Sequence, residues 1–110
     1  MLHPTFRAQL PLLSRLFKEH KIKSAYVFGS VVSDKFTDES DIDILINFEE
    51  GLEPLEKGEI WWNLYDKLRD LFNREVDLLI ESSLKNPYFI EDINEKKQLI
   101  YAAHINTLEY

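Results

Sequence analysis

The junction between two apolar segments constrains the fold of this chain more than any other feature. Residues 24–28 (SAYVF) are rich in strand-forming side chains and stop at Gly29, as expected of a strand that leads into a tight turn. Residues 41–48 (DIDILINF) alternate in character, so that apolar side chains share one face while Asp41 and Asp43 share the other. The sequence therefore predicts a sheet that carries small and acidic residues where these two strands meet.

The rest of the chain alternates helices with further strands. Apolar side chains at helical spacing and capping residues predict three helices. The first starts near Leu10, the second has its entry at Pro54 and is regular after Gly58, including residues 60–72, and the third is capped by Asn86 with Pro87 in its first position. Residues 75–80 alternate like a strand and carry Asp77, and residues 98–102 fit a short closing strand. The order α-β-β-α-β-α-β predicts an α+β (α/β sandwich-like) domain, in which a mixed sheet of three to four strands packs against helices.

Length and charge limit the possible classes of protein. A chain of 110 residues without repeat or long linker suits one domain, residues 1–110. Its apolar runs are too short to cross a bilayer and its N-terminus lacks a signal peptide's apolar stretch, so a cytoplasmic protein without membrane contact is expected. The net charge of −7 opposes binding to extended nucleic acid, because affinity for a phosphate backbone comes mostly from Lys and Arg.

The aspartates have the spacing of metal ligands. Asp41 and Asp43 are expected to point the same way from one strand, about 6.5–7 Å apart. Such carboxylates repel one another unless a cation lies between them, and a chain without cysteine favours a hard ion such as magnesium. Solvated acids at the start of a strand are the simpler alternative, but the additional strand aspartate, Asp77, favours a metal site.

The Gly-Ser pair next to these acids suggests a phosphate contact. Gly29 allows the main chain to approach a phosphate closely, and the following N–H groups and the Ser30 hydroxyl can donate hydrogen bonds to it. If the aspartates do not converge, a plain turn at the end of a strand is the better interpretation. Together the polar positions predict phosphoryl or nucleotidyl transfer, in which carboxylates hold two ions.

Other conspicuous side chains receive no catalytic role. His3, His20 and His104 are scattered along the chain without a ligand partner, and all three are expected at the surface. Trp61 belongs to the apolar face of its helix, whereas Trp62 lies about 100° around the axis and is expected to be exposed. Trp62 therefore marks either the edge of the core or a contact for a partner.

These residues resemble a known family, the minimal nucleotidyltransferases (MNT) of the DNA polymerase β-like superfamily. The signature is a Gly-Ser pair, ten residues and an Asp-x-Asp motif, which Gly29, Ser30, Asp41 and Asp43 match. Asp77 matches the family's third carboxylate, on a later strand. The resemblance spans nearly the whole chain, including a C-terminal stretch, SLKNPYFIEDINEKKQLIY, that is also MNT-like.

The resemblance implies a polymerase β-like nucleotidyltransferase core and an enzyme that transfers AMP from ATP to an acceptor hydroxyl. Asp41 and Asp43 would hold two magnesium ions, and Asp77 would ligate the ion that activates the nucleophile and help to take its proton. Gly29 and Ser30 would position the β- and γ-phosphates of the nucleotide.

The resemblance also implies a protein partner. Members of the MNT family commonly pair with a HEPN-domain protein, and such a pair resembles a toxin–antitoxin system in which the antitoxin adenylylates a tyrosine of the toxin. This MntA-like antitoxin role is the leading expectation. A binding module that neutralises the HEPN partner by occlusion is the first alternative, since Ser33 and Asp34 stand where family members often carry Arg and Gly. Transfer to a small molecule such as an aminoglycoside is the second.

Overall fold

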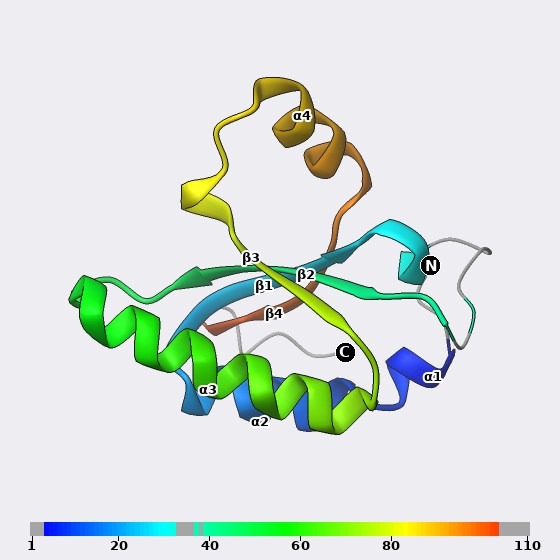
Figure 1. Cartoon of the computed structure of the whole chain (residues 1–110), viewed down its shortest axis with the longest axis horizontal. Helices are drawn as coiled ribbons and strands as arrows, with labels where there is room; N and C mark the ends of the chain where they lie inside the picture. Colours follow the sequence, from blue (N-terminus) through cyan, green and yellow to red (C-terminus); the bar gives the residue numbers. More distant parts are fainter. Residues whose placement is uncertain (1–3, 33–36, 38, 104–110) are drawn as a thin grey trace.

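The protein builds one four-stranded sheet with helices on both of its faces (Figure 1). The computed structural model describes residues 4–32, 37 and 39–103. The helices are α1 (Pro4–Arg7), α2 (Leu10–Glu19), α3 (Pro54–Phe72) and α4 (Pro87–Lys96), with short 3₁₀ turns η1 (Gly29–Val32) and η2 (Glu81–Ser83). The strands are β1 (Ile22–Phe28), β2 (Ile42–Phe48), β3 (Val76–Ile80) and β4 (Gln98–Ala102).

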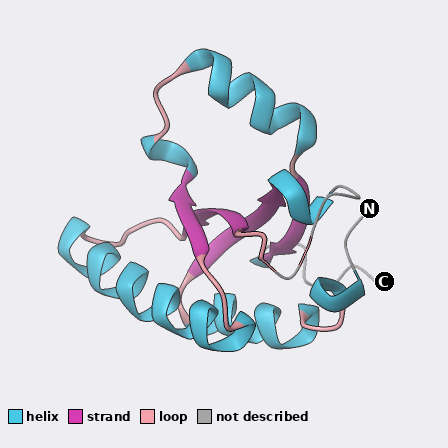
Figure 2. Cartoon of the chain, turned by 45° about the vertical axis from the view of Figure 1, so that its right-hand side comes forward, coloured by secondary structure: helices cyan, strands magenta, loops and turns pink. Residues whose placement is uncertain are grey.

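The strand order is β3-β2-β1-β4, which makes the sheet mixed. β1 pairs antiparallel with both β2 and β4, whereas β2 and β3 run parallel. Parallel neighbours need a crossover, and the 19-residue helix α3 supplies it between β2 and β3. Figure 2 shows the strands at the centre of the molecule, with α4 on the opposite side from the long helices. The predicted α+β class and element order are confirmed.

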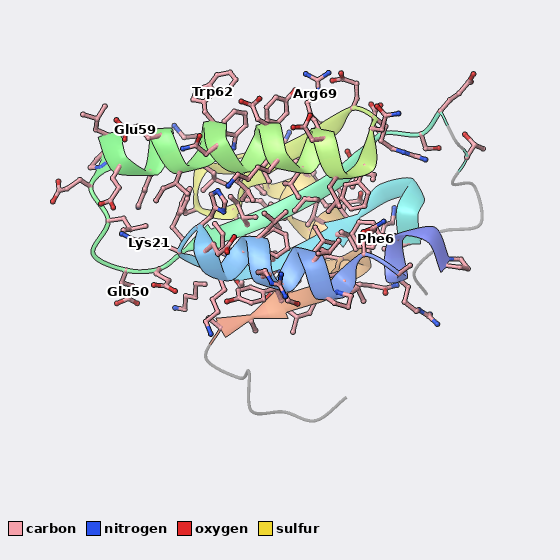
Figure 3. The ribbon with its side chains drawn as sticks, turned by 90° about the horizontal axis from the view of Figure 1, so that it is seen from below. Phe6, Lys21, Glu50, Glu59, Trp62 and Arg69 are labelled. Atoms are coloured by element: carbon pink, nitrogen blue, oxygen red, sulfur yellow. The ribbon has the colours of Figure 1, made fainter. Side chains whose placement is uncertain are left out.

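The hydrophobic core lies between one face of the sheet and the helices α2 and α3, which lie side by side in Figure 3. The alternation predicted for residues 41–48 supplies the sheet's part of it, because Ile42, Ile44 and Ile46 are fully buried there. From the helices come Leu13, Phe17, Leu64 and Leu68, all without exposed surface. The other face of β2 carries Asp43 and Asn47, with the fully buried Leu45 between them.

The first turn of α3 corrects a prediction. The helix begins at Pro54, the predicted entry, whose fixed φ suits the first helical position, and it is already regular before Gly58. A Cβ placed on Gly58 would meet no atom within 4 Å, so nothing in the packing demands a glycine there. The helical cost of one glycine, about 1 kcal/mol, is small beside the burial of side chains further along the helix.

The end of α3 and the start of α4 follow local rules. Asn73 adopts the left-handed conformation that commonly ends a helix (φ 53°), and its N–H donates to the carbonyl of Arg69 at 2.7 Å. At α4, the Asn86 side chain accepts hydrogen bonds from the N–H groups of Tyr88 (2.9 Å) and Phe89 (3.3 Å). The cap predicted for the last helix is thus confirmed.

One histidine is not where it was expected. His20 is buried, with 8% of its surface exposed, and its Nδ1 donates to the carbonyl of Leu16 at 2.8 Å. The ring closes the last turn of α2, so the prediction of a surface histidine was wrong for His20. His3 and His104 lie outside the described residues. Among the described residues, no helix combines the length and the apolar composition that spanning a membrane requires.

Candidate active site

The ends of three neighbouring strands lie on the same side of the sheet, at right angles to its edge strands. β2 and β3 are parallel and start there, and the antiparallel β1 finishes there at Phe28. The register sets Asp43 of β2 opposite Phe28 on one side and opposite Asp77 of β3 on the other. Residues paired across neighbouring strands share a face and lie about 5 Å apart. The structure therefore brings Asp43 and Asp77 together, on the sheet face that α2 and α3 leave uncovered.

The pKa of Asp43 is raised by its surroundings. Burial, the charge of Asp77 and the charge of Asp41 raise the pKa of Asp43 from 3.8 to about 6. A hydrogen bond with the Asp77 side chain contributes to the same shift. Ionising Asp43 therefore costs more than ionising an isolated carboxyl group, and a cation bound beside it would offset that cost.

Gly29 lies directly against the Asp43 carboxylate. Its φ of +76° lies in the region that side-chain-bearing residues rarely adopt, so the turn after β1 favours glycine. A Cβ added at Gly29 would overlap the carboxylate of Asp43. The main chain of the turn thus passes within contact distance of the acidic pair. Only a residue without a side chain fits this position.

Some predicted positions are described only in part. The main chain of Ser30 lies in the 3₁₀ turn η1, Gly29–Val32, that follows β1. Its hydroxyl lies outside the described part of the structure, as do Ser33 and Asp34. The predicted phosphate contact of Ser30 therefore stays a prediction.

Asp41 lies at the rim of the site. It directly precedes β2, is exposed, and is close enough for its charge to raise the pKa of Asp43. Within the described residues, no three His, Asp or Glu side chains already converge as a complete set of metal ligands. Asp43 and Asp77 form the paired centre, and Asp41 stands beside them. This all-oxygen set of carboxylates fits a hard divalent cation, which would offset both the burial and the like charges that raise the pKa of Asp43.

An aromatic pair borders the site. Phe28, opposite Asp43 in the ladder, meets Phe89 of α4 edge to face, with ring centroids 6.5 Å apart. Phe89 is 40% exposed, so the pair presents apolar surface next to the acids. Sequence reasoning did not associate Phe89 with the site, because no local pattern shows that α4 returns over the ends of the strands. The alternation of residues 24–28, which places Phe28 on the face of Asp43, was the available signal.

A polar cluster fixes the arch that carries α4 (Figure 1). Glu81 of η2 accepts hydrogen bonds from Asn47 Nδ2 (2.6 Å) and from Lys97 Nζ (2.8 Å). Lys97 also lies over the Tyr26 ring, 4.2 Å from its centroid. Burial favours a higher pKa for Glu81, but the hydrogen bonds from Asn47 and Lys97 and the charge of Lys97 lower it overall. This clamp holds both ends of the arch, η2 and the start of β4, on the sheet face opposite α2 and α3.

Comparisons with known proteins agree with this geometry. The pattern of the polymerase beta nucleotidyltransferase family matches residues 12–106. A protein of Methanocaldococcus jannaschii, MJ0128, is named a protein adenylyltransferase; it is 41% identical over 78% of this chain and 82% of its own length. MJ0126 of the same organism carries the same type of name and is 40% identical over the same shares.

Solved structures show the same fold. A structure described as a minimal nucleotidyltransferase is 28% identical, with a TM-score of 0.65 over 89% of this chain and 95% of that one. A toxin–antitoxin structure with AMP-PNP gives a TM-score of 0.67 at 20% identity, over 88% of this chain and 76% of that one. The MNT antitoxin complex with the tri-AMPylated HEPN toxin of Shewanella oneidensis gives 0.61 at 18% identity, over 92% and 76%. The predicted fold family is thus confirmed, and the chain belongs to the polymerase beta nucleotidyltransferase family.

Proposed function

We propose that this protein is a magnesium-dependent adenylyltransferase, which moves AMP from ATP to a tyrosine hydroxyl of a HEPN-type partner and acts as the antitoxin of that pair. The observation that carries the proposal is the side-by-side placement of Asp43 and Asp77 with Gly29 against them. Membership in the nucleotidyltransferase family supports the reaction type, and relatives named protein adenylyltransferases support a protein acceptor.

The acidic residues would act through their shared electrostatics. Asp41, Asp43 and Asp77 would hold the magnesium ions, and these ions would supply Lewis-acid stabilisation of the charge that develops on the phosphate oxygens. At pH values below about 6, where Asp43 holds a proton, that proton would leave when the site is loaded, because metal ligands must be deprotonated. Metal and proton therefore compete for the same carboxylate.

The turn at Gly29 would receive the phosphates. Because its main chain lies against Asp43, a phosphate tail held there would lie beside the carboxylates that neutralise it through the metal. The N–H groups and the Ser30 hydroxyl of the turn would donate to the β- and γ-phosphates. The α-phosphorus would then face the acidic pair.

The transfer itself needs one bond made and one broken. The acceptor oxygen would form a bond to the α-phosphorus, while the bond from that phosphorus to the oxygen bridging the β-phosphate breaks and pyrophosphate leaves. The proton of the acceptor hydroxyl would pass to Asp77, which is exposed and can release it to water. The product is the AMP ester of the acceptor.

The acceptor proposed is a tyrosine of a separate protein. One structural relative is a complex of an MNT antitoxin with a tri-AMPylated HEPN toxin, and another is a toxin–antitoxin structure with AMP-PNP. These likenesses, together with the predicted family role, lead us to infer a HEPN-type partner and ATP as the AMP donor. The exposed edge of Phe89 beside the acids offers an apolar contact for an aromatic acceptor.

The test uses the tagged protein and the HEPN-type protein that co-purifies with it. The partner is incubated with the wild type, Asp43→Asn or Asp66→Asn, with magnesium and ATP, and its tyrosines are read by mass spectrometry. The wild type and Asp66→Asn, whose exposed carboxylate lies on α3, should add AMP, whereas Asp43→Asn should lose the activity about a hundredfold or more. If no AMP is added while wild type and Asp43→Asn suppress the partner's toxicity equally, the protein acts by occlusion and the proposal is wrong.

A further inference from the structure

We infer that Arg74 is a positioning residue for this reaction, which fixes Asp41 beside the Asp43–Asp77 pair; this inference rests on the proposed function. Arg74 lies in the turn between α3 and β3, outside the motif that predicted the site. Its Nη1 atom donates to two main-chain carbonyls, those of Thr37 at 2.9 Å and Ser40 at 3.0 Å.

The contacted carbonyls belong to the segment that leads into β2. The C=O of Ser40 is part of the peptide unit whose nitrogen belongs to Asp41, so Arg74 holds the plane from which the Asp41 main chain departs. The Ser40 N–H also donates to the Thr37 carbonyl at 3.1 Å, and the Thr37 N–H donates to Ser40 Oγ at 2.9 Å. The two carbonyls that Arg74 bridges are thus members of one closed turn.

Arg74 is also tied to the strand that carries the third aspartate. Arg74 precedes Asp77 by three residues. The main-chain carbonyl of its neighbour Glu75 accepts a hydrogen bond from the Ile42 N–H at 3.1 Å. The Arg74 side chain, from the turn just before β3, therefore holds the segment just before β2. This matters because Asp41 lies before the first ladder pair, Ile42 with Val76. The bond from Ile42 holds the peptide unit after Asp41, and the bond from Arg74 to the Ser40 carbonyl holds the peptide unit before it.

The chemistry of arginine suits this task better than that of lysine. A planar guanidinium directs its N–H groups in fixed directions, so bridging two carbonyls fixes orientation as well as distance. A lysine at position 74 could reach one carbonyl but would leave the turn less defined. Residues that orient metal ligands without touching the metal typically change metal affinity 10–100-fold when they are replaced.

Arg69 provides a matched control. It lies one turn earlier, near the end of α3 (Figure 3), and its Nη2 pairs with the exposed Glu75 carboxylate at 2.9 Å. Arg69→Met removes the same charge from the same region of the molecule as Arg74→Met. Only the Arg74 variant removes the hydrogen bonds to the turn before Asp41.

The first measurement needs neither metal nor nucleotide. Amide hydrogen exchange of the Ile42 N–H, followed by NMR in the metal-free protein, reports whether the start of β2 stays fixed. Arg74→Met should speed this exchange about tenfold, as expected when hydrogen bonds from a charged donor are lost, whereas Arg69→Met should not. Equal exchange of the Ile42 N–H in the two variants would show that Arg74 does not fix the start of β2, whatever the protein's activity.

The second measurement tests the link to the site. Manganese binding with AMP-PNP, followed by electron paramagnetic resonance, should weaken about 10–100-fold in Arg74→Met, weaken less in Arg74→Lys, and be unchanged in Arg69→Met. Faster Ile42 exchange in Arg74→Met with unchanged manganese affinity would show that the Arg74 hydrogen bonds do not serve the metal site. This result would overturn the inference. If the wild type binds no manganese nucleotide, the proposed function fails, while the exchange experiment still decides whether Arg74 fixes the segment.

Discussion

Gly29 and Asp43 are in direct contact at the end of β1 and the start of β2, so the backbone of one defines the space for the carboxylate of the other. The ladder that pairs Phe28 with Asp43 brings Gly29 to this point, and a φ of +76° turns its main chain towards the acid. The close approach is a tertiary consequence of a strand ending in a glycine opposite a strand that begins with acids.

The contact predicts a large effect of a small substitution. Gly29→Ala should destabilise the protein by about 1–3 kcal/mol, because alanine is strained at this φ and its methyl group overlaps the Asp43 carboxylate. Gly51→Ala is the matched control, since Gly51 has a φ of +88° but open space around it. Urea unfolding of both variants measures the difference. Equal destabilisation would show that the contact with Asp43 adds nothing to the backbone strain.

The raised pKa of Asp43 predicts an unusual pH dependence of stability in the metal-free protein. The folded state holds this proton up to about pH 6, whereas the unfolded chain releases it near its ordinary pKa of 3.8. The folded state is therefore favoured as the pH falls through 6, and this contribution is fully present only below the unfolded pKa.

Above about pH 6, the ionised Asp43 carboxylate destabilises the folded state, and replacing it with an amide removes this cost. Asp43→Asn should be more stable than the wild type at about pH 8, with the difference shrinking as the pH approaches 4. Thermal melting across this range, without divalent ions, provides the measurement. The exposed Asp66→Asn on α3 is the control and should not reproduce the trend. A pH-independent difference for Asp43→Asn would contradict the assigned electrostatics.

Metal binding should show the same competition with protons. Magnesium with ATP should raise the melting temperature at about pH 8, because a ligand that binds only the folded state stabilises it, by about 2.7 kcal/mol at a hundred times its Kd. The increase should decline below about pH 6, where Asp43 retains its proton. Asp43→Asn should show little increase at any pH. A shift of equal size in Asp43→Asn would place the bound ion elsewhere.

The clamp at the base of the arch predicts different roles for two adjacent lysines. Lys97→Met leaves Glu81 half-buried without its cation and should destabilise the protein by about 1–3 kcal/mol. Lys96→Met removes only an exposed pair with Asp92, one helical turn away, and should change stability little. Denaturant midpoints of both variants compare the two ion pairs directly. A larger loss in Lys96→Met would mean that the arch is not held at Glu81.

Much of the fold could be predicted from local patterns. The alternation in residues 41–48, the apolar spacing of α2 and the cap at Asn86 depend on neighbours in sequence. The helix spacing and the cap were confirmed, and the alternation was confirmed from Ile42 onward. The regular start of α3 predicted after Gly58 was wrong, because the rule for Gly58 gives way to packing that sequence alone does not reveal. His20 was misplaced for the same reason, since its burial follows from where α2 meets the sheet.

The sequence by itself determined the candidate residues and the face of β2 from which Asp43 points, because side chains alternate along a strand whatever lies next to it. Asp41 precedes the strand, so alternation does not fix its direction. Only the tertiary structure decided that β3 lies beside β2 in parallel, which sets Asp77 against Asp43 although 33 residues separate them. It also decided the reach of Arg74 to the segment before Asp41 and the contact of Phe89 with Phe28. The physical reason is that strand order and register follow from burying α2 and α3 against one face of the sheet, a condition on the whole chain that no short segment contains.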